Sequence, residues 1–132
     1  MTKVLTPPNH VALLIAYLTQ FFVDGVVRAE EPDTADYDPE SLLILVKDAG
    51  QSSPVAHTFW DCMTGLEVRH GDRTTAYEAA GKVDALLRVI PDSTIHYHRS
   101  LNSPQYDPEP EHGVPAYTWA IQHRIRGQVI EL

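Results

Sequence analysis

The sequence lacks the residues and motifs on which most secreted proteins and many enzymes depend. It contains one cysteine, Cys62, so no disulfide can form within the chain, and we expect synthesis in a reducing cytoplasm. Its neighbours Phe59, Trp60 and Met63 predict a buried, unreactive thiol. The seven glycines form neither a phosphate-binding loop nor a GxSxG motif. We therefore predict a protein that is not an enzyme, with no catalytic residues and no cofactor.

Basic residues and long apolar runs are also scarce. Ten Lys and Arg residues stand against eighteen Asp and Glu residues, which gives a net charge of −8. Because a tight grip on phosphates needs a dense basic surface, we do not expect tight DNA binding, although an acidic surface suits a channel through which DNA slides. The most apolar stretch, residues 11–23, is too short and too interrupted for a bilayer. We expect no membrane span and no signal peptide.

The remaining composition is that of one globular domain. Hydrophobic residues make up 43% of the chain and charged residues 21%, which are ordinary proportions for a folded protein. A chain of 132 residues supports one hydrophobic core rather than two. We therefore predict a single domain over residues 1–132.

The N-terminal part predicts a helix and then a short strand. Thr6 followed by Pro7 and Pro8 is a common helix start. Apolar residues then recur at three- and four-residue spacing, which predicts a helix over about residues 8–23. The β-branched residues that follow the Asp-Gly turn signal predict a strand over 26–29.

The middle of the chain predicts a loop and two strands. Residues 30–40 carry six acids, two prolines and no base, which predicts an exposed loop. The apolar run 42–46 predicts a strand buried on both faces in the middle of a sheet. Residues 48–54 are turn-like, and residues 55–70 predict a strand with a break near 64–65.

The second half predicts a helix and two more strands. Asp72 is a candidate N-cap, with a capping box at Thr75 and Glu78 as the alternative, and Pro91 ends the helix. A strand over 94–101 and a strand over 116–126 follow. The last strand alternates apolar and polar residues, as an edge or one-sided strand does. This order predicts an α+β fold, a mostly antiparallel mixed sheet with two helices packed on one face.

The histidines are the main hint of chemistry. His96 and His98 share one face of their predicted strand, a spacing that zinc sites use. Further ligands could come from neighbouring strands: His70, His123, Asp61 and Cys62. No HExxH or paired CxxC motif accompanies them, and one-sided strands often carry exposed histidines. We therefore favour surface or interface histidines and predict no metal ligand.

Two acidic loops are the candidate contact surfaces. The 30–40 loop lacks the glycine and the terminal glutamate of an EF-hand, which favours a solvated loop over a Ca²⁺ site or an acid–base pair. Loops of eleven residues on a compact domain are commonly functional, which favours a role at a subunit contact or a lumen. The same interpretation applies to the proline-rich acidic loop over 104–114.

Several segments follow one another in an order that is typical of a known family. They are GVVRAE at Gly25–Glu30, SLLILVK at Ser41–Lys47, Leu66–Asp72 leading into TTAYEAAGKVDALL, Pro115–Trp119, and Arg124–Arg126. This order resembles that of the small tail terminator proteins of long-tailed, siphovirus-type bacteriophages, over nearly the whole chain. The stretch 55–64 departs from the pattern because it is longer than the link expected there.

The resemblance implies a structural role in a virion. Tail terminators form a homohexameric ring that docks on the last ring of tail-tube protein, ends tube polymerisation and offers its other face to the neck or connector, while DNA passes through the lumen without specific binding. The implied location is the head-proximal end of the tail, after assembly in the host cytoplasm. Closed rings use head-to-tail interfaces. The candidate interface residues are Glu30, Glu31, Asp33, Asp36, Asp38, Tyr106, Asp107, Glu109, Gln122, Arg124 and Arg126.

Two other functions stay open at this point. A different neck component, such as a head–tail connector or stopper, shares the size, charge and oligomeric habit of a terminator. A small host domain that binds a metal or ligand through the His96/His98 face belongs to a different class. That second function predicts stoichiometric metal or a pocket of converging polar groups.

Overall fold

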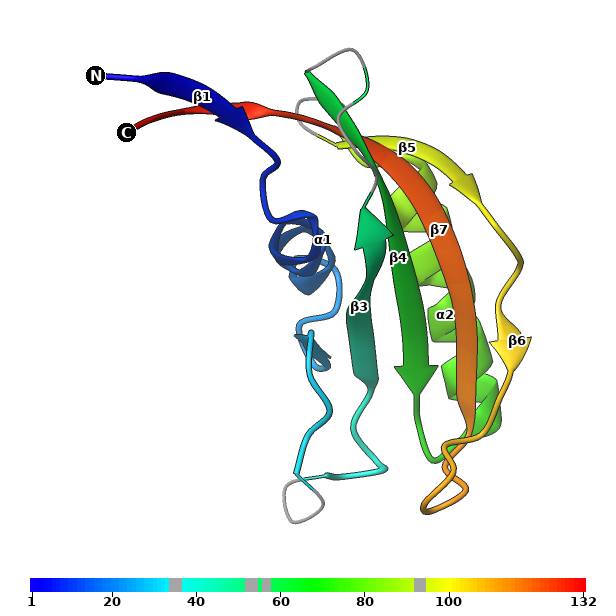
Figure 1. The fold of residues 1–132 in the computed structure, drawn as a ribbon. Coiled ribbons are helices and arrows are strands. Elements are labelled where there is room, and N and C mark those ends of the chain that lie inside the picture. The colour runs from blue at the N-terminus through cyan, green and yellow to red at the C-terminus, as the bar shows by residue number, and fades with distance from the viewer. Residues whose placement is uncertain (34–36, 52–54, 56–57, 92–94) are drawn as a thin grey trace.

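A computed structural model describes residues 1–33, 37–51, 55, 58–91 and 95–132, without the side chains of residues 97 and 98. Two helices and eight strands are described, and Figure 1 shows their arrangement. In chain order they are β1 (Lys3–Thr6), α1 (His10–Thr19), β2 (Val26–Arg28), β3 (Leu43–Gln51), β4 (Phe59–Arg69), α2 (Arg73–Arg88), β5 (Ile95–Ser100), β6 (Gln105–Tyr106), β7 (Ala116–Arg126) and β8 (Gln128–Glu131).

The main sheet has six strands in the order β2-β3-β4-β7-β5, with β6 also paired to β7. The pairing of β2 with β3 is parallel, and the other pairings are antiparallel. The long strands β4 and β7 pair without interruption from Phe59↔Arg126 to Arg69↔Ala116. The predicted α+β fold, with a mostly antiparallel mixed sheet, is confirmed.

Both helices cover the same face of this sheet. Alternate residues of β4 and β7 point toward them because successive side chains of a strand point to opposite faces. The resulting core joins Leu14 and Leu18 of α1 to Val83 and Leu87 of α2, and all four are almost completely buried. The two helices also meet directly, since the Tyr17 hydroxyl donates to the Leu86 carbonyl oxygen at 2.9 Å.

The first helix is shorter than predicted and begins later. Its N-cap is Asn9, whose side-chain oxygen accepts a hydrogen bond from the Ala12 amide. Thr6 instead ends strand β1, which the sequence did not predict. The helix stops at Thr19 rather than near residue 23. Asn caps a helix at least as well as Thr, which is why Asn9 can take the role predicted for Thr6.

The strands in the middle of the chain are more regular than predicted. Residues 48–51 continue β3 rather than forming a turn, because they pair with 62–64 through a register shift at Asp48/Gly50. Gly50 has a φ of +129° there, a value that glycine accepts readily. No break occurs at 64–65, since both residues pair on each side. Residues 52–54, also predicted as a turn, lie outside the described residues.

The second half agrees more closely with prediction. Asp72 is the N-cap of α2 and accepts from the Thr75 amide at 3.2 Å, so the first of the two predicted caps is the one used. The 104–114 segment is not entirely a loop, because Gln105 and Tyr106 pair with β7 as strand β6. β7 lies between β4 and β5, so it is not an edge strand. Its buried residues alternate with partly exposed ones, as the prediction of a one-sided strand requires.

Strands β1 and β8 form a separate two-stranded antiparallel ribbon, from Lys3↔Glu131 to Thr6↔Gln128. Figure 1 shows this ribbon pointing away from the body of the molecule. Gly127 separates β8 from β7, and a Cβ at this position would lie 2.6 Å from Cζ3 of Trp60. The close approach of the Trp60 ring explains why the chain leaves the sheet at a glycine.

Replacing Gly127 with alanine is expected to destabilise the fold by about 1 to 3 kcal/mol, because Trp60 is buried and cannot move away without strain. The matched control is Gly81→Ala in α2, where a Cβ would meet nothing within 4 Å. This control should stabilise the protein by up to about 1 kcal/mol, since alanine favours helix over glycine. Urea unfolding of both variants checks the opposite signs, and a G127A variant as stable as wild type would contradict the packing described.

Candidate functional site

Glu31, near the start of the 30–40 loop, is attached to the sheet face that the helices leave uncovered. Arg69 is buried on this face and donates two hydrogen bonds to the Glu31 carboxylate, at 2.8 and 2.5 Å, and a third to Glu67. Lys47 Nζ lies 3.5 Å from Glu67 and 3.8 Å from Glu31. Glu31 therefore has an internal partner, and it holds the start of the loop against the sheet.

The other acids predicted for this loop point to solvent where they are described. Glu30, Asp33 and Asp38 are exposed, and Asp38 accepts a hydrogen bond from the Glu40 amide. Asp36 lies outside the described residues. The three exposed carboxylates remain candidates for a subunit contact.

The 104–114 segment separates into an exposed aromatic and an internal carboxylate. Tyr106 is 41% exposed, and the Arg73 guanidinium lies over its ring at 3.7 Å. Glu109 is buried and accepts hydrogen bonds from the Glu111 and His112 amides. Glu109 therefore organises its own loop, whereas Tyr106 and the exposed Asp107 are available for contact.

The predicted polar face of the last strand lies on the uncovered side of the sheet. Arg124 pairs across the strands with Asp61 at 2.8 Å. Gln122 is partly exposed, and Arg126 is exposed with its guanidinium 5.6 Å from the centre of the Phe59 ring. This part of the sheet is a mixed polar surface, and part of its charge is already paired.

An apolar groove of about 700 Å³ lies on the helical side of the molecule. Its lining includes Phe21, Phe22, Leu42, Ala79, Leu86 and Val89. Phe21 is 49% exposed and Val89 70% exposed, so the groove presents apolar side chains to solvent. Sequence reasoning placed Phe22 on the apolar face of the first helix and Leu42 in a buried strand, and it did not identify the groove.

The β1–β8 ribbon is the second exposed apolar surface. Leu5 and Val129 pair across its strands on one face and are 41% and 63% exposed. Ile130, on the opposite face, is 36% exposed. An isolated two-stranded ribbon is marginally stable at best in water. The four-residue strands of this ribbon bury little against each other, so a further surface is needed to hold them.

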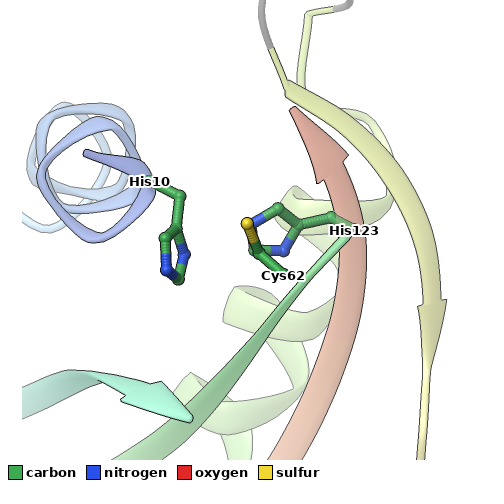
Figure 2. Close-up of side chains that lie close together, drawn as sticks. All are labelled: His10, Cys62 and His123. Carbon is green, nitrogen blue, oxygen red and sulfur yellow. The ribbon is translucent and has the colours of Figure 1, made fainter. Parts of the chain in front are cut away.

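A buried polar cluster lies between α1 and the sheet. His10, Cys62 and His123 offer ligand atoms that all lie within 4.8 Å of one another. His10 is 4% exposed, and the other two side chains are fully buried. Figure 2 shows His10 reaching from α1 toward Cys62 and His123 on the sheet, where these two residues are directly paired on β4 and β7.

This arrangement differs from the histidine site considered from the sequence. His96 pairs in register with Arg124 rather than with His123, and the side chain of His98 lies outside the described residues. His70 is engaged elsewhere, with the Glu40 carbonyl and the Asp72 amide. Sequence reasoning named Cys62 and His123 among the possible ligands but did not name His10. The signal was present, because His10, Leu14 and Leu18 share a four-residue spacing that puts them on one helix face.

Hydrogen bonds orient His10 within the cluster. Its Nδ1 lies 3.1 Å from the Thr64 hydroxyl, and its Nε2 lies 3.3 Å from an Asp48 carboxylate oxygen. The hydrogen bond from the Gly50 amide, together with His10, lowers the pKa of Asp48 although burial opposes this. An ionised carboxylate can only accept a hydrogen bond, so the Nε2 atom of His10 carries the proton of its contact with Asp48. The other ring nitrogen of His10, Nδ1, faces the Thr64 hydroxyl.

Burial raises the pKa of the Cys62 thiol to about 11, and the nearby Asp48 carboxylate adds to the shift. The thiol is therefore protonated at neutral pH, and the thiolate is the reactive form. We expect the native protein to react with a thiol-alkylating reagent far more slowly than the same chain in denaturant, with the rate following global unfolding. Mass spectrometry of timed samples checks this, and fast modification of the native protein would show that Cys62 is accessible.

Neither of the two described helices is long and apolar enough to cross a membrane. No protein-family model matches the chain, and no curated protein matches its sequence.

Proposed function

We propose that this protein is a non-enzymatic structural subunit of a bacteriophage tail, a terminator whose copies form a ring on the end of the tail tube. The ring is a hexamer, ends tube polymerisation and joins the tail to the neck, and DNA passes through its lumen without specific binding. The β1–β8 ribbon is the observation that carries the assembly part of this proposal. Its exposed apolar residues need a partner, and the partner we propose is a neighbouring copy.

The chain offers the two different surfaces that a head-to-tail ring requires. In such a ring one patch of each copy meets a different patch on the next copy. The ribbon points away from its own body (Figure 1), so it does not fill the groove of its own chain. We assign the ribbon of one copy to the groove lined by Phe21, Phe22 and Val89 on the next. Leu5 and Val129 supply the apolar contact.

The order of elements also supports the proposal. The family resemblance rests on an amphipathic helix, two strands, a strand leading into an alanine-rich helix, and a final aromatic strand. The structure has these as α1, β2, β3, β4, α2 and β7 in the same sequence. The excess of eighteen acids over ten bases fits a lumen that does not hold DNA, because like charges repel.

The mass of the purified protein in solution tests the proposal, measured by light scattering alone and after mixing with tail-tube protein of the same phage. Rings of about six copies, or caps at one end of short tubes in negative-stain images, are the expected result. A protein that stays monomeric and leaves tube length unchanged would overturn it. Binding to a portal or connector ring without any effect on tubes would instead favour another neck component.

A further inference from the structure

The His10, Cys62 and His123 cluster has the composition of a transition-metal site. Two imidazoles and one thiolate are ligands that zinc accepts, and catalytic-type zinc centres hold the ion with three protein ligands. The three side chains come from α1, β4 and β7, and all are buried. A chance group of surface ligands is exposed to solvent, whereas this group lies inside the core.

We propose that His10, Cys62 and His123 bind one zinc ion, with Asp48 as the carboxylate that orients His10. A tetrahedral zinc ion with bonds of about 2.0 Å to nitrogen and about 2.3 Å to sulfur holds its ligands roughly 3.5 Å apart. Ligand atoms that already lie within 4.8 Å of one another need only small side-chain rotations to reach this spacing. Three protein ligands leave the fourth position for a water molecule.

The hydrogen bonds of His10 prepare it as a ligand. Metal-bound histidines usually donate their other ring N–H to a carboxylate or carbonyl. Asp48 accepts from Nε2 at 3.3 Å, which leaves Nδ1 for the ion. Nδ1 now faces the Thr64 hydroxyl at 3.1 Å, and that hydroxyl can rotate to donate elsewhere when the ion takes its place.

Binding would change the charge of the cluster and tie three elements together. The Cys62 thiol loses its proton to solvent as the zinc–sulfur bond forms, because only the thiolate is a ligand. The ion then joins α1 to β4 and β7, close to where the chain passes from β1 into α1 at His10. It would fix the base of the ribbon without taking part in the contact that the ribbon makes.

Titration of the full-length protein with Zn²⁺ and with Co²⁺ tests the site. We expect one ion per chain, a higher melting temperature, and for Co²⁺ a thiolate-to-metal absorption band in the near ultraviolet with intense visible bands of a four-coordinate ion. Cys62→Ser should abolish the near-ultraviolet band, and His10→Asn should weaken binding strongly. Asp48→Asn should weaken it about 10- to 100-fold, as changes to orienting partners do.

His112→Gln is the matched control, because His112 belongs to the other described group of nearby ligands, with Glu109 and Glu111. This variant should bind as the wild type does. The proposal is wrong if the near-ultraviolet band is absent from wild type or survives in C62S, or if H112Q removes binding. D48N, whose substituted side chain is mostly exposed, keeps the test valid if C62S or H10N does not fold.

Discussion

Replacing Arg69 with methionine is expected to lower the free energy of unfolding by about 3 kcal/mol. Arg69 is 6% exposed and pairs with Glu67, which is 14% exposed, and with Glu31. Removing one partner of a buried ion pair leaves an uncompensated charge, which typically costs about 3 to 5 kcal/mol. We expect the lower end because Lys47 remains 3.5 Å from Glu67. Denaturant unfolding measures the difference.

Two controls separate the buried charge from the loss of an arginine. Arg69→Met combined with Glu67→Gln should regain much of the lost stability, because the charge that lacked a partner is also removed. Arg99→Met on β5 should change stability by no more than about 0.5 kcal/mol, since Arg99 is exposed. A loss below about 1 kcal/mol in R69M, or an equal loss in R99M, would contradict the account of this cluster.

The same cluster predicts an acid dependence of stability. The hydrogen bonds that Arg69 donates to Glu31 lower the pKa of Glu31, although burial acts in the opposite direction. Glu31 therefore stabilises the folded protein fully above the ordinary pKa of a glutamate. This stabilisation is lost as the pH falls through the lower pKa that Glu31 has in the folded protein. R69M should flatten this part of the stability profile.

Val129→Glu is expected to abolish ring formation and leave the 14.8 kDa chain as a monomer. Val129 is 63% exposed on the ribbon, so the substitution should not disturb the fold. In the assembled ring it would place a carboxylate in an apolar contact, which is costly without a partner. The proposed closed ring would repeat that cost at every interface. Light scattering measures the mass of the variant.

Gln128→Glu is the matched control for this prediction. It adds the same charge to the same strand, at a position that is already polar and pairs with Thr6. Rings of Q128E and monomers of V129E would locate the contact on the apolar face of the ribbon. Rings of wild-type mass in V129E would show that the ribbon is not an interface.

Much of the fold could be predicted because local patterns determine it. Asp72 caps α2, the stripe from Ala76 to Leu87 is buried, and the alternation in β7 matches its two faces. The ribbon could not be predicted in the same way. Strands β1 and β8 are four residues long, which is too short for either to show a local period of its own. They pair with each other although nearly the whole chain separates them.

The sites were harder to predict because they depend on which elements meet. Cys62 and His123 pair on adjacent strands, but His10 reaches them only because α1 packs on that part of the sheet. In a similar way, Glu31 was predicted for an outward contact, and its pairing with Arg69, which lies 38 residues further along the chain, could not be predicted from the sequence. Only the tertiary arrangement shows which acids already have a partner within the chain.

The most direct test of the head-to-tail assembly mixes two variants that each lack one surface. V129E blocks the ribbon, and Ala85→Arg blocks the groove from an exposed position on α2. Each variant alone should be a monomer under conditions in which the wild type forms rings. An equimolar mixture keeps one intact ribbon and one intact groove, so it should form dimers of twice the 14.8 kDa chain mass and nothing larger. A mixture that remains monomeric would contradict the pairing of ribbon with groove.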